Sequence, residues 1–114
     1  MHYKRSDRVA AFIREEVSTM LLSELKDPAV KSITITKTRV TDDLRHAKIY
    51  YSVLGEAEKK AESAKALDRA TGFIRTELGR RLKIRFVPSI TFLFDDTTEY
   101  ADHIEHLLKK IKEN

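Results

Sequence analysis

The segment 69–88, RATGFIRTELGRRLKIRFVP, holds the side chains in this sequence that are best suited to bind an anion. It contains one carboxylate, Glu77, and six cations: Arg69, Arg75, Arg80, Arg81, Lys83 and Arg85. The whole chain of 114 residues carries a net charge of only +4, so the positive field is concentrated here. Such a local field attracts polyanions, and the usual polyanion for a small domain is nucleic acid, so the segment predicts nucleic-acid binding.

Two other groups of side chains have residue types found in metal sites. Asp95, Asp96 and Glu99 could hold Mg²⁺ as in a nuclease, yet the order Asp-Thr-Thr-Glu before a helix is ordinary capping chemistry, which we favour. His103 and His106 stand three apart, whereas the zinc-protease helix needs histidines four apart. The sequence also has no nucleotide-cradling glycine loop and no nucleophile beside a base. We therefore expect no catalytic residues, no metal and no cofactor, and a nuclease is the third hypothesis.

Composition indicates an ordered globular chain. Charged residues make up 35% and hydrophobic residues 41%, with three glycines, two prolines and no cysteine. The lack of cysteine suits a reducing cytosol, and the charged N-terminus fits neither a signal peptide nor a membrane span. We expect a cytoplasmic protein with a single domain over residues 1–114, a core over about 6–95 and a helical tail over about 98–112.

The first half of the chain predicts a helix followed by a hairpin. Apolar residues recur at helical spacing from Ser6, a credible N-cap, to Leu25, and Asp27-Pro28 ends that helix. Strand patterns follow at 32–40 and 45–54, joined by the turn residues 41–44. Ile33 and Ile35 are out of phase with Val40, so either a bulge shifts the register or the far end of the first strand turns its face.

The second half predicts helix and then strand. A helical pattern runs from about 57 to 81, and its apolar face comprises Ala66, Leu67, Ala70, Ile74, Leu78 and Leu82. Gly72 and Gly79 interrupt this pattern, and a kink at Gly72 that divides it into two helices is the simplest explanation. Residues 83–87 and 89–95 are predicted to be extended, with Ile90, Phe92 and Phe94 on one face.

This order, helix, strand, strand, helix, kinked helix, strand and short C-terminal helix, is that of an α+β type II KH-like domain with a three-stranded sheet and helices on one face. The chain also resembles the ribosome-binding factor A family of bacteria, from about residue 6 to 104. The resemblance is carried by Arg8-Val9, Ile13, Asp27-Pro28, the segment 43–50 (DLRHAKIY), Gly72-Phe73-Ile74-Arg75, Leu78-Gly79-Arg80-Arg81-Leu82, Arg85, Pro88 and Phe92. Ordinary KH domains have a Gly-x-x-Gly loop between two helices. The resemblance implies instead an interhelical kink at Ala70, Thr71 and Gly72.

The resemblance implies a role in ribosome assembly. It implies binding to the immature small ribosomal subunit, contact with its ribosomal RNA near the 5′ end, and help in late maturation and RNA processing, including in the cold. Small-subunit RNA and ribosomal proteins are the implied partners. We expect the protein to act as a monomer.

The candidate RNA-binding residues are cationic or adjoin cations. We expect recognition of phosphate and shape, because few exposed aromatic residues accompany these charges. Tyr50 is the one candidate stacking platform, whereas Phe73, Phe86, Phe92 and Phe94 are expected in the core. On the helix the candidates are Arg69, Gly72, Arg75, Thr76, Arg80, Arg81, Lys83 and Arg85; on the hairpin they are Lys37, Arg39, Arg45 and Lys48; a third strip is Lys4, Arg5 and Arg8.

A second function class is a protein-interaction module. In that hypothesis the KH-like scaffold binds a protein through its tail helix or a sheet edge, and the cations only keep the chain soluble. Charge reversal at Arg80 should then matter little, whereas replacing Ile104 or Leu107 by Asp should matter more.

Overall fold

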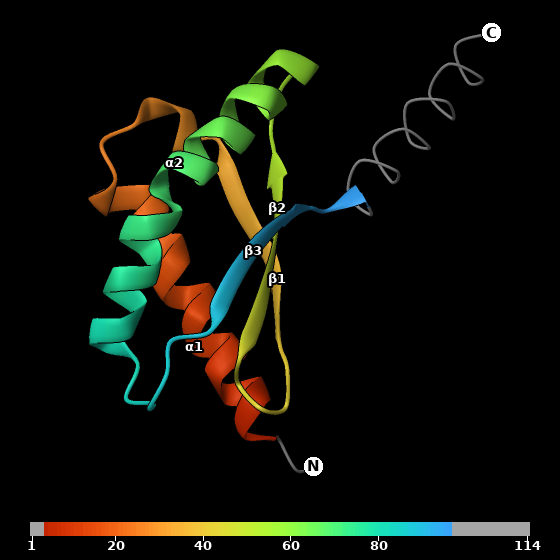
Figure 1. Cartoon of the computed structure of the whole chain (residues 1–114). Coiled ribbons are helices and arrows are strands. Elements are labelled where there is room, and N and C mark those ends of the chain that lie inside the picture. Colours follow the sequence, from red (N-terminus) through yellow and green to blue (C-terminus); the bar gives the residue numbers. More distant parts are fainter. Residues whose placement is uncertain (1–3, 97–114) are drawn as a thin grey trace, which may run out of the picture.

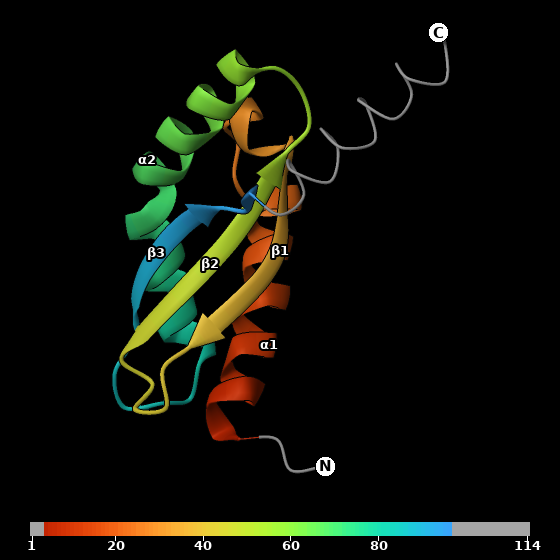
Figure 2. The same ribbon diagram turned by 90° about the vertical axis from the view of Figure 1, so that its right-hand side faces the viewer.

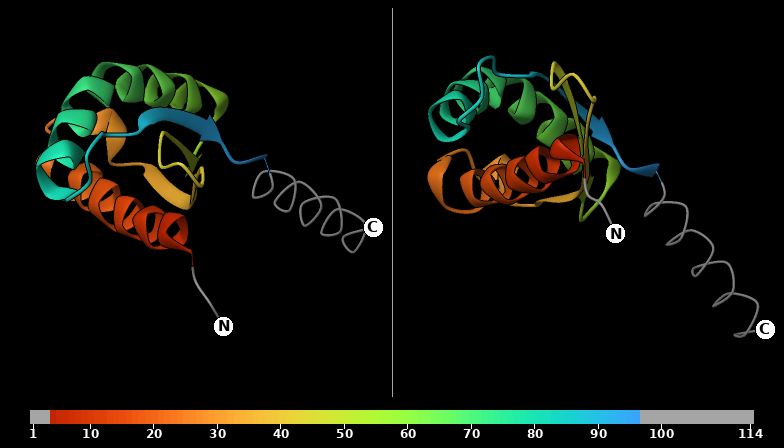
Figure 3. Two further views of the ribbon diagram at one scale, coloured as in Figure 1. Left: turned by 60° about the horizontal axis from the view of Figure 1, so that its bottom comes forward. Right: turned by 90° about the horizontal axis from the view of Figure 1, so that it is seen from below.

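The computed structural model describes residues 4–96, which form a three-stranded sheet with two helices on one of its faces (Figure 1). The elements are α1 (Arg5–Thr19), β1 (Ile33–Val40), β2 (His46–Val53), α2 (Ala57–Arg81) and β3 (Ser89–Phe94). Both helices lie on the same side of the sheet, and no described element covers the other side (Figure 3). The predicted α+β architecture is confirmed. The predicted tail helix at about 98–112, with His103 and His106, lies outside the described residues.

The N-cap of α1 lies two residues before the one that the sequence suggested. Lys4 is the N-cap, and its backbone N–H donates to the Asp7 carboxylate at 3.1 Å. The predicted N-cap Ser6 is wrong, because Ser6 is buried inside α1, where its hydroxyl donates to the Asp42 carboxylate. A π-helical turn over Met20–Glu24 continues α1, and the chain then breaks before Pro28 as predicted.

The sheet has the order β1-β2-β3, with β1 antiparallel and β3 parallel to β2 (Figure 2). The register shifts between Ile35 and Lys37, so the predicted bulge is confirmed. Its effect is to return the far end of β1 to the correct phase, because an extra residue reverses the faces of those that follow. Parallel pairing of β2 with β3 needs a crossover connection, which α2 supplies.

The prediction of two helices divided at Gly72 is wrong, because α2 is one continuous helix of 25 residues. Figure 1 shows that its ribbon nevertheless changes direction part-way along. Thr71 provides a physical cause: its hydroxyl donates to the Leu67 carbonyl at 2.7 Å, and such bonding to the preceding turn bends helices without breaking them. The helix therefore bends and keeps its backbone ladder.

The core lies between the helices and the sheet, and the predicted apolar face of α2 is fully buried in it. Its largest fully buried apolar side chains are Ile13, Met20, Leu21, Ile49, Leu67, Ile74 and Leu78. The prediction that Phe73 and Phe86 lie in the core is wrong, because Phe73 is 43% exposed and Phe86 is 63% exposed.

The segment 83–87 between α2 and β3, which was predicted to be extended, bends at 84–86 and has no regular structure. Its ends are held because Leu82 and Pro88 are buried. Val87 lies so close to α2 that a Cβ on Gly79 would meet its Cγ2 at 2.8 Å. Gly79 therefore allows the chain to fold back against the helix that it has just left. By contrast, a Cβ on Gly72 would meet nothing within 4 Å.

This difference predicts opposite effects of the same substitution on stability. Gly79→Ala should lower the free energy of unfolding by about 1–2 kcal/mol, because β-branched Val87 is stiff and must shift. Gly72→Ala should raise it by about 0.5–1 kcal/mol, because alanine gains helix propensity without a clash. Urea denaturation of both variants checks this, and equal effects at the two sites would contradict the assigned role of Gly79.

Candidate nucleic-acid interface

The helix stripe, defined as Arg69, Gly72, Arg75, Thr76, Arg80 and Lys83, runs along the solvent side of α2 and just beyond its end. All six residues are exposed, and helical periodicity predicts this for Arg69, Thr76, Arg80 and Lys83. With open space over Gly72, the helix backbone there is accessible between Arg69 and Arg75. A phosphate backbone can therefore approach α2 closely at this point.

Two arginines of the helix stripe make exposed ion pairs. Arg69 donates to the Asp27 carboxylate at 2.7 Å, and Arg80 donates to Glu77 at 3.3 Å. The hydrogen bond from Arg69, with that from the Ala29 backbone N–H, holds the pKa of Asp27 below its ordinary value. Exposed pairs of this kind are weak, so both guanidinium groups can still exchange their partners for phosphate.

Arg81 faces inward and is surrounded by carboxylates. Its guanidinium donates to Glu16 at 2.8 Å, to Glu24, and to Glu77 at 3.3 Å. The hydrogen bonds that Arg81 donates to Glu24 and Glu16 raise the pKa of this guanidinium above its ordinary value. The side chain is only 25% exposed, so its N–H donors stabilise the fold. Arg81 is therefore no longer a candidate phosphate ligand.

Arg75 and Lys83 are the stripe cations that make no ion pair with any residue in the range 4–96. Arg85 beyond them is also exposed, and its guanidinium lies over the Phe86 ring at 5.3 Å. These three side chains keep their full hydrogen-bonding capacity for an external anion.

The hairpin candidates lie on a different face. Arg39 and Lys48 are cross-strand partners, and with Lys37 they form the sheet strip on the side of the sheet that no described helix covers. Tyr50, the predicted stacking platform, is half-buried, and the Lys37 ammonium lies over its ring at 4.5 Å. The structure therefore does not bring the sheet strip and the helix stripe together, because the sheet stands between them.

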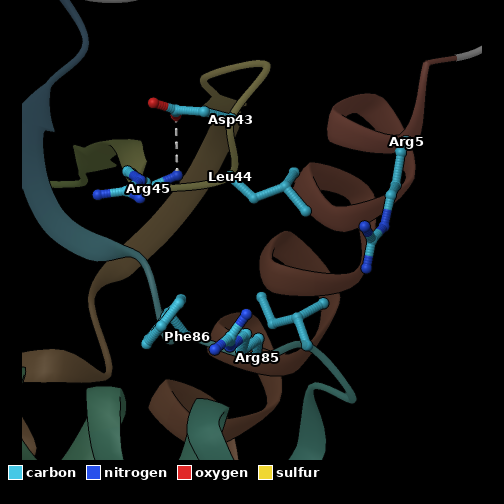
Figure 4. A pocket seen from close by; sticks show the side chains of 7 residues that line it. Arg5, Asp43, Leu44, Arg45, Arg85 and Phe86 are labelled. Carbon is cyan, nitrogen blue, oxygen red and sulfur yellow. Dashed lines mark hydrogen bonds between the residues drawn. The ribbon is translucent and has the colours of Figure 1, made fainter.

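Arg45 belongs to neither surface. It lies at the end of the molecule where α1 begins, the hairpin turns and the segment 83–87 crosses (Figure 4). Arg5 from the third predicted strip and Arg85 line the same hollow as Arg45. The fold thus gathers three predicted cations from distant parts of the chain.

Sequence reasoning missed the exposed aromatic residues. Phe73 lies one turn from Arg69 on α2, and Phe86 follows Arg85, so two exposed rings accompany the cations after all. The premise for expecting recognition of phosphate alone is therefore wrong. No signal marked Phe86 as exposed, since Lys83-Ile84-Arg85-Phe86 alternates polar and apolar residues as a half-buried strand does.

The acidic residues considered as Mg²⁺ ligands were Asp95, Asp96 and Glu99. Asp95 is buried and accepts a hydrogen bond from the Thr36 hydroxyl at 2.6 Å. Within residues 4–96, no three His, Asp or Glu side chains are grouped so that they could hold a metal ion. Glu99 lies outside the described residues.

Within residues 4–96, no helix is long and apolar enough to cross a membrane.

Comparison with known proteins assigns the family. The family model for ribosome-binding factor A matches residues 5–108. The chain belongs to the ribosome-binding factor A family. It is similar to ribosome-binding factor A of Syntrophobacter fumaroxidans, with 47% identity over 116 residues that cover 100% of this chain and 99% of the relative.

Solved structures of ribosome-binding factor A share the fold. The crystal structure of the Thermus thermophilus protein matches with a TM-score of 0.66 and 24% identity, over 77% of this chain and 93% of that one. A Thermus thermophilus ribosome-binding factor A model fitted into a cryo-electron microscopy map of a 30S complex matches with a TM-score of 0.55 and 26% identity, over 76% and 96% of the two chains. The KH-like fold predicted from the order of elements is therefore confirmed.

Arg80 and Arg81 are neighbours with different surroundings, which predicts different losses of stability when each is replaced. Arg81→Gln should lower the Tm by several degrees, because it leaves Glu16 and Glu24 without their shared cation. Arg80→Gln should change the Tm little, because Arg80 makes one exposed pair. Thermal denaturation followed by circular dichroism checks this, and a Tm for Arg81→Gln equal to that of Arg80→Gln would contradict the structural role of Arg81.

Proposed function

We propose that this protein is a non-catalytic assembly factor that binds the immature small ribosomal subunit through its ribosomal RNA. In this role it contacts the RNA near the 5′ end and assists late maturation and RNA processing, including at low temperature. It acts in the cytoplasm as a monomer whose chain forms a single domain. Family membership supports this proposal, as does the similarity to a ribosome-binding factor A model fitted into a 30S complex.

The observation that carries the proposal is the helix stripe with its accessible backbone. Arg75 and Lys83 are exposed and make no ion pair within the described chain, and Gly72 beside Arg75 leaves room for a phosphate backbone. The one carboxylate of the segment, Glu77, is turned toward Arg80 and Arg81. An external phosphate therefore meets two cations, Arg75 on α2 and Lys83 just beyond it, that are not paired with any carboxylate of residues 4–96.

Low temperature increases the need for a protein that binds one RNA conformer. Cold stabilises incorrect RNA pairings as well as correct ones, so misfolded RNA escapes more slowly. A protein that binds one RNA conformer preferentially shifts the population toward it by its difference in affinity between the conformers. Such an effect needs no chemical step, which agrees with a role in binding alone.

The protein-interaction module stays the alternative. The tail helix that it would use lies outside the described residues, and β1 and β3 are the two edge strands of the sheet. Binding through such an edge depends on backbone hydrogen bonds and apolar contacts, so it should respond weakly to salt and to charge reversal on α2.

Charge reversal on the helix stripe tests the proposal. Arg75→Glu/Lys83→Glu should abolish most binding to immature small subunits, because each lost phosphate contact lowers the affinity and reduces the steepness of its salt dependence by about one. The measurement is co-sedimentation with purified immature and mature small subunits across a salt series. Arg81 is left unchanged, since its reversal would disturb the ion pairs with Glu16 and Glu24.

Lys59→Glu/Lys65→Glu is the matched control, because it makes the same change of charge at exposed positions in the first half of α2. This variant should keep most of the wild-type binding. Wild-type binding that does not weaken with salt, or equal loss in both double variants, would refute the helix stripe as the RNA-binding surface.

A further inference from the structure

Three adjoining hollows form a groove at the end of the molecule where α1 begins. The first, of about 470 Å³, lies between α1 and the end of α2; the second, of about 180 Å³, adjoins the hairpin turn; the third, of about 330 Å³, adjoins the start of β3. The first two share Arg5 and Ile84, and the last two share Arg45 and Phe86. We call these three hollows, linked by their shared lining residues, the end groove.

The wall that carries Phe86 is held firmly although it has no regular structure. Leu82 and Pro88 are buried at its two ends, and Val87 packs on Gly79. The Ser89 N–H donates to the Arg45 carbonyl at 2.8 Å, which joins this segment to the hairpin. Loops positioned in this way by a rigid scaffold are where binding residues are commonly found.

An exposed aromatic ring stands in the end groove. Phe86 is 63% exposed, and the Arg85 guanidinium lies 5.3 Å from its ring centroid. On the opposite side of the second hollow, Leu44 adopts a φ of 62° and points toward α1 (Figure 4). A leucine rarely adopts this left-handed conformation, and such strain is concentrated at functional sites.

The charge of the end groove is strongly positive. Its cations that make no ion pair within the described chain are Arg5, Arg8, Arg45, Lys83 and Arg85. Among the described residues that line it, the only carboxylate is Asp43, which accepts hydrogen bonds from the Thr41 hydroxyl at 2.6 Å and from the Arg45 N–H at 3.0 Å. These bonds hold the pKa of Asp43 below its ordinary value, so this carboxylate stabilises the turn.

We propose that the end groove binds unpaired RNA, with one base stacked on Phe86 and the neighbouring phosphates bound by Arg45, Arg85 and Lys83. This inference rests on the proposed function, because it names the form of RNA that one part of the protein recognises. Exposed aromatic rings beside arginines are the usual platforms for unpaired bases, whereas a duplex keeps its bases stacked inside. The surrounding cations favour a chain of phosphates over an acidic peptide.

The test uses the full chain and single-stranded octauridylate containing 5-iodouridine. Irradiation should crosslink the RNA to Phe86, as identified by mass spectrometry. Phe86→Ala should weaken octauridylate binding roughly 5- to 100-fold, because stacking on an aromatic side chain is lost. Phe86→Trp should keep the binding, and Phe86→Leu should lose it as alanine does, because leucine keeps apolar bulk without an aromatic plane.

Leu54→Ala is the matched control, because Leu54 is 86% exposed and follows β2 at the opposite end of the sheet. This variant should bind octauridylate as the wild type does, and all variants should keep the wild-type Tm. Equal binding by wild type and Phe86→Ala, or full binding by Phe86→Leu, would overturn the stacking proposal. Phe86-dependent binding of an alternating Glu-Leu peptide without octauridylate binding would also overturn it and identify a protein-binding groove.

The two proposals fail in distinguishable ways. If the wild type does not sediment with small subunits in a salt-dependent manner, the proposed function fails whatever octauridylate does. If small-subunit binding is salt-dependent and lost in Arg75→Glu/Lys83→Glu, while Phe86→Ala binds octauridylate normally, only the end groove is refuted.

Discussion

The ion pairs of Arg81 join the parts of the structure on which both candidate surfaces depend. One guanidinium binds carboxylates from α1, from the π-helical turn that follows it and from α2 itself. Each pair is partly exposed and contributes little alone, but together they fix the end of α2 against α1. That end determines where Lys83 stands and where the segment 83–87 departs. The network also gathers negative charge between the helices and leaves the outer face of α2 positive.

The elements were predictable because burial imposes periodicity on a sequence. A helix with one buried face repeats every 3.6 residues and a strand with one buried face repeats every two, so α1, β1, β2, α2 and β3 all left a pattern. Even the bulge was one of the two explanations that the phase of Ile35 and Val40 allowed, and the register shift decides in its favour. Where a helix or strand buries one face, its apolar residues repeat periodically, and the sequence alone was sufficient to predict that element.

The failures have a common physical cause, which is dependence on tertiary contacts that the periodicity of the sequence does not encode. Arg81 looks like its neighbour Arg80 in sequence, yet its partners Glu16 and Glu24 are 65 and 57 positions away. Phe86 looks like a core residue by type, but its exposure is decided by the approach of Val87 to Gly79. Helical spacing places both Arg80 and Arg81 near the surface, and only the packing of α1 distinguishes them.

The continuity of α2 constrains how this domain can bind RNA. In a helix interior each N–H is bonded to a carbonyl four residues earlier, so the backbone around Gly72 has no free donor for a phosphate. In ordinary KH domains a Gly-x-x-Gly loop between two helices lets bare backbone approach phosphates. Here side chains such as Arg75 must bind the phosphates, and Gly72 only provides access. Side-chain cations on a regular helix recognise spacing and shape. Recognition of an unpaired base needs an aromatic plane held outside the core, and the irregular segment after α2 provides one at Phe86.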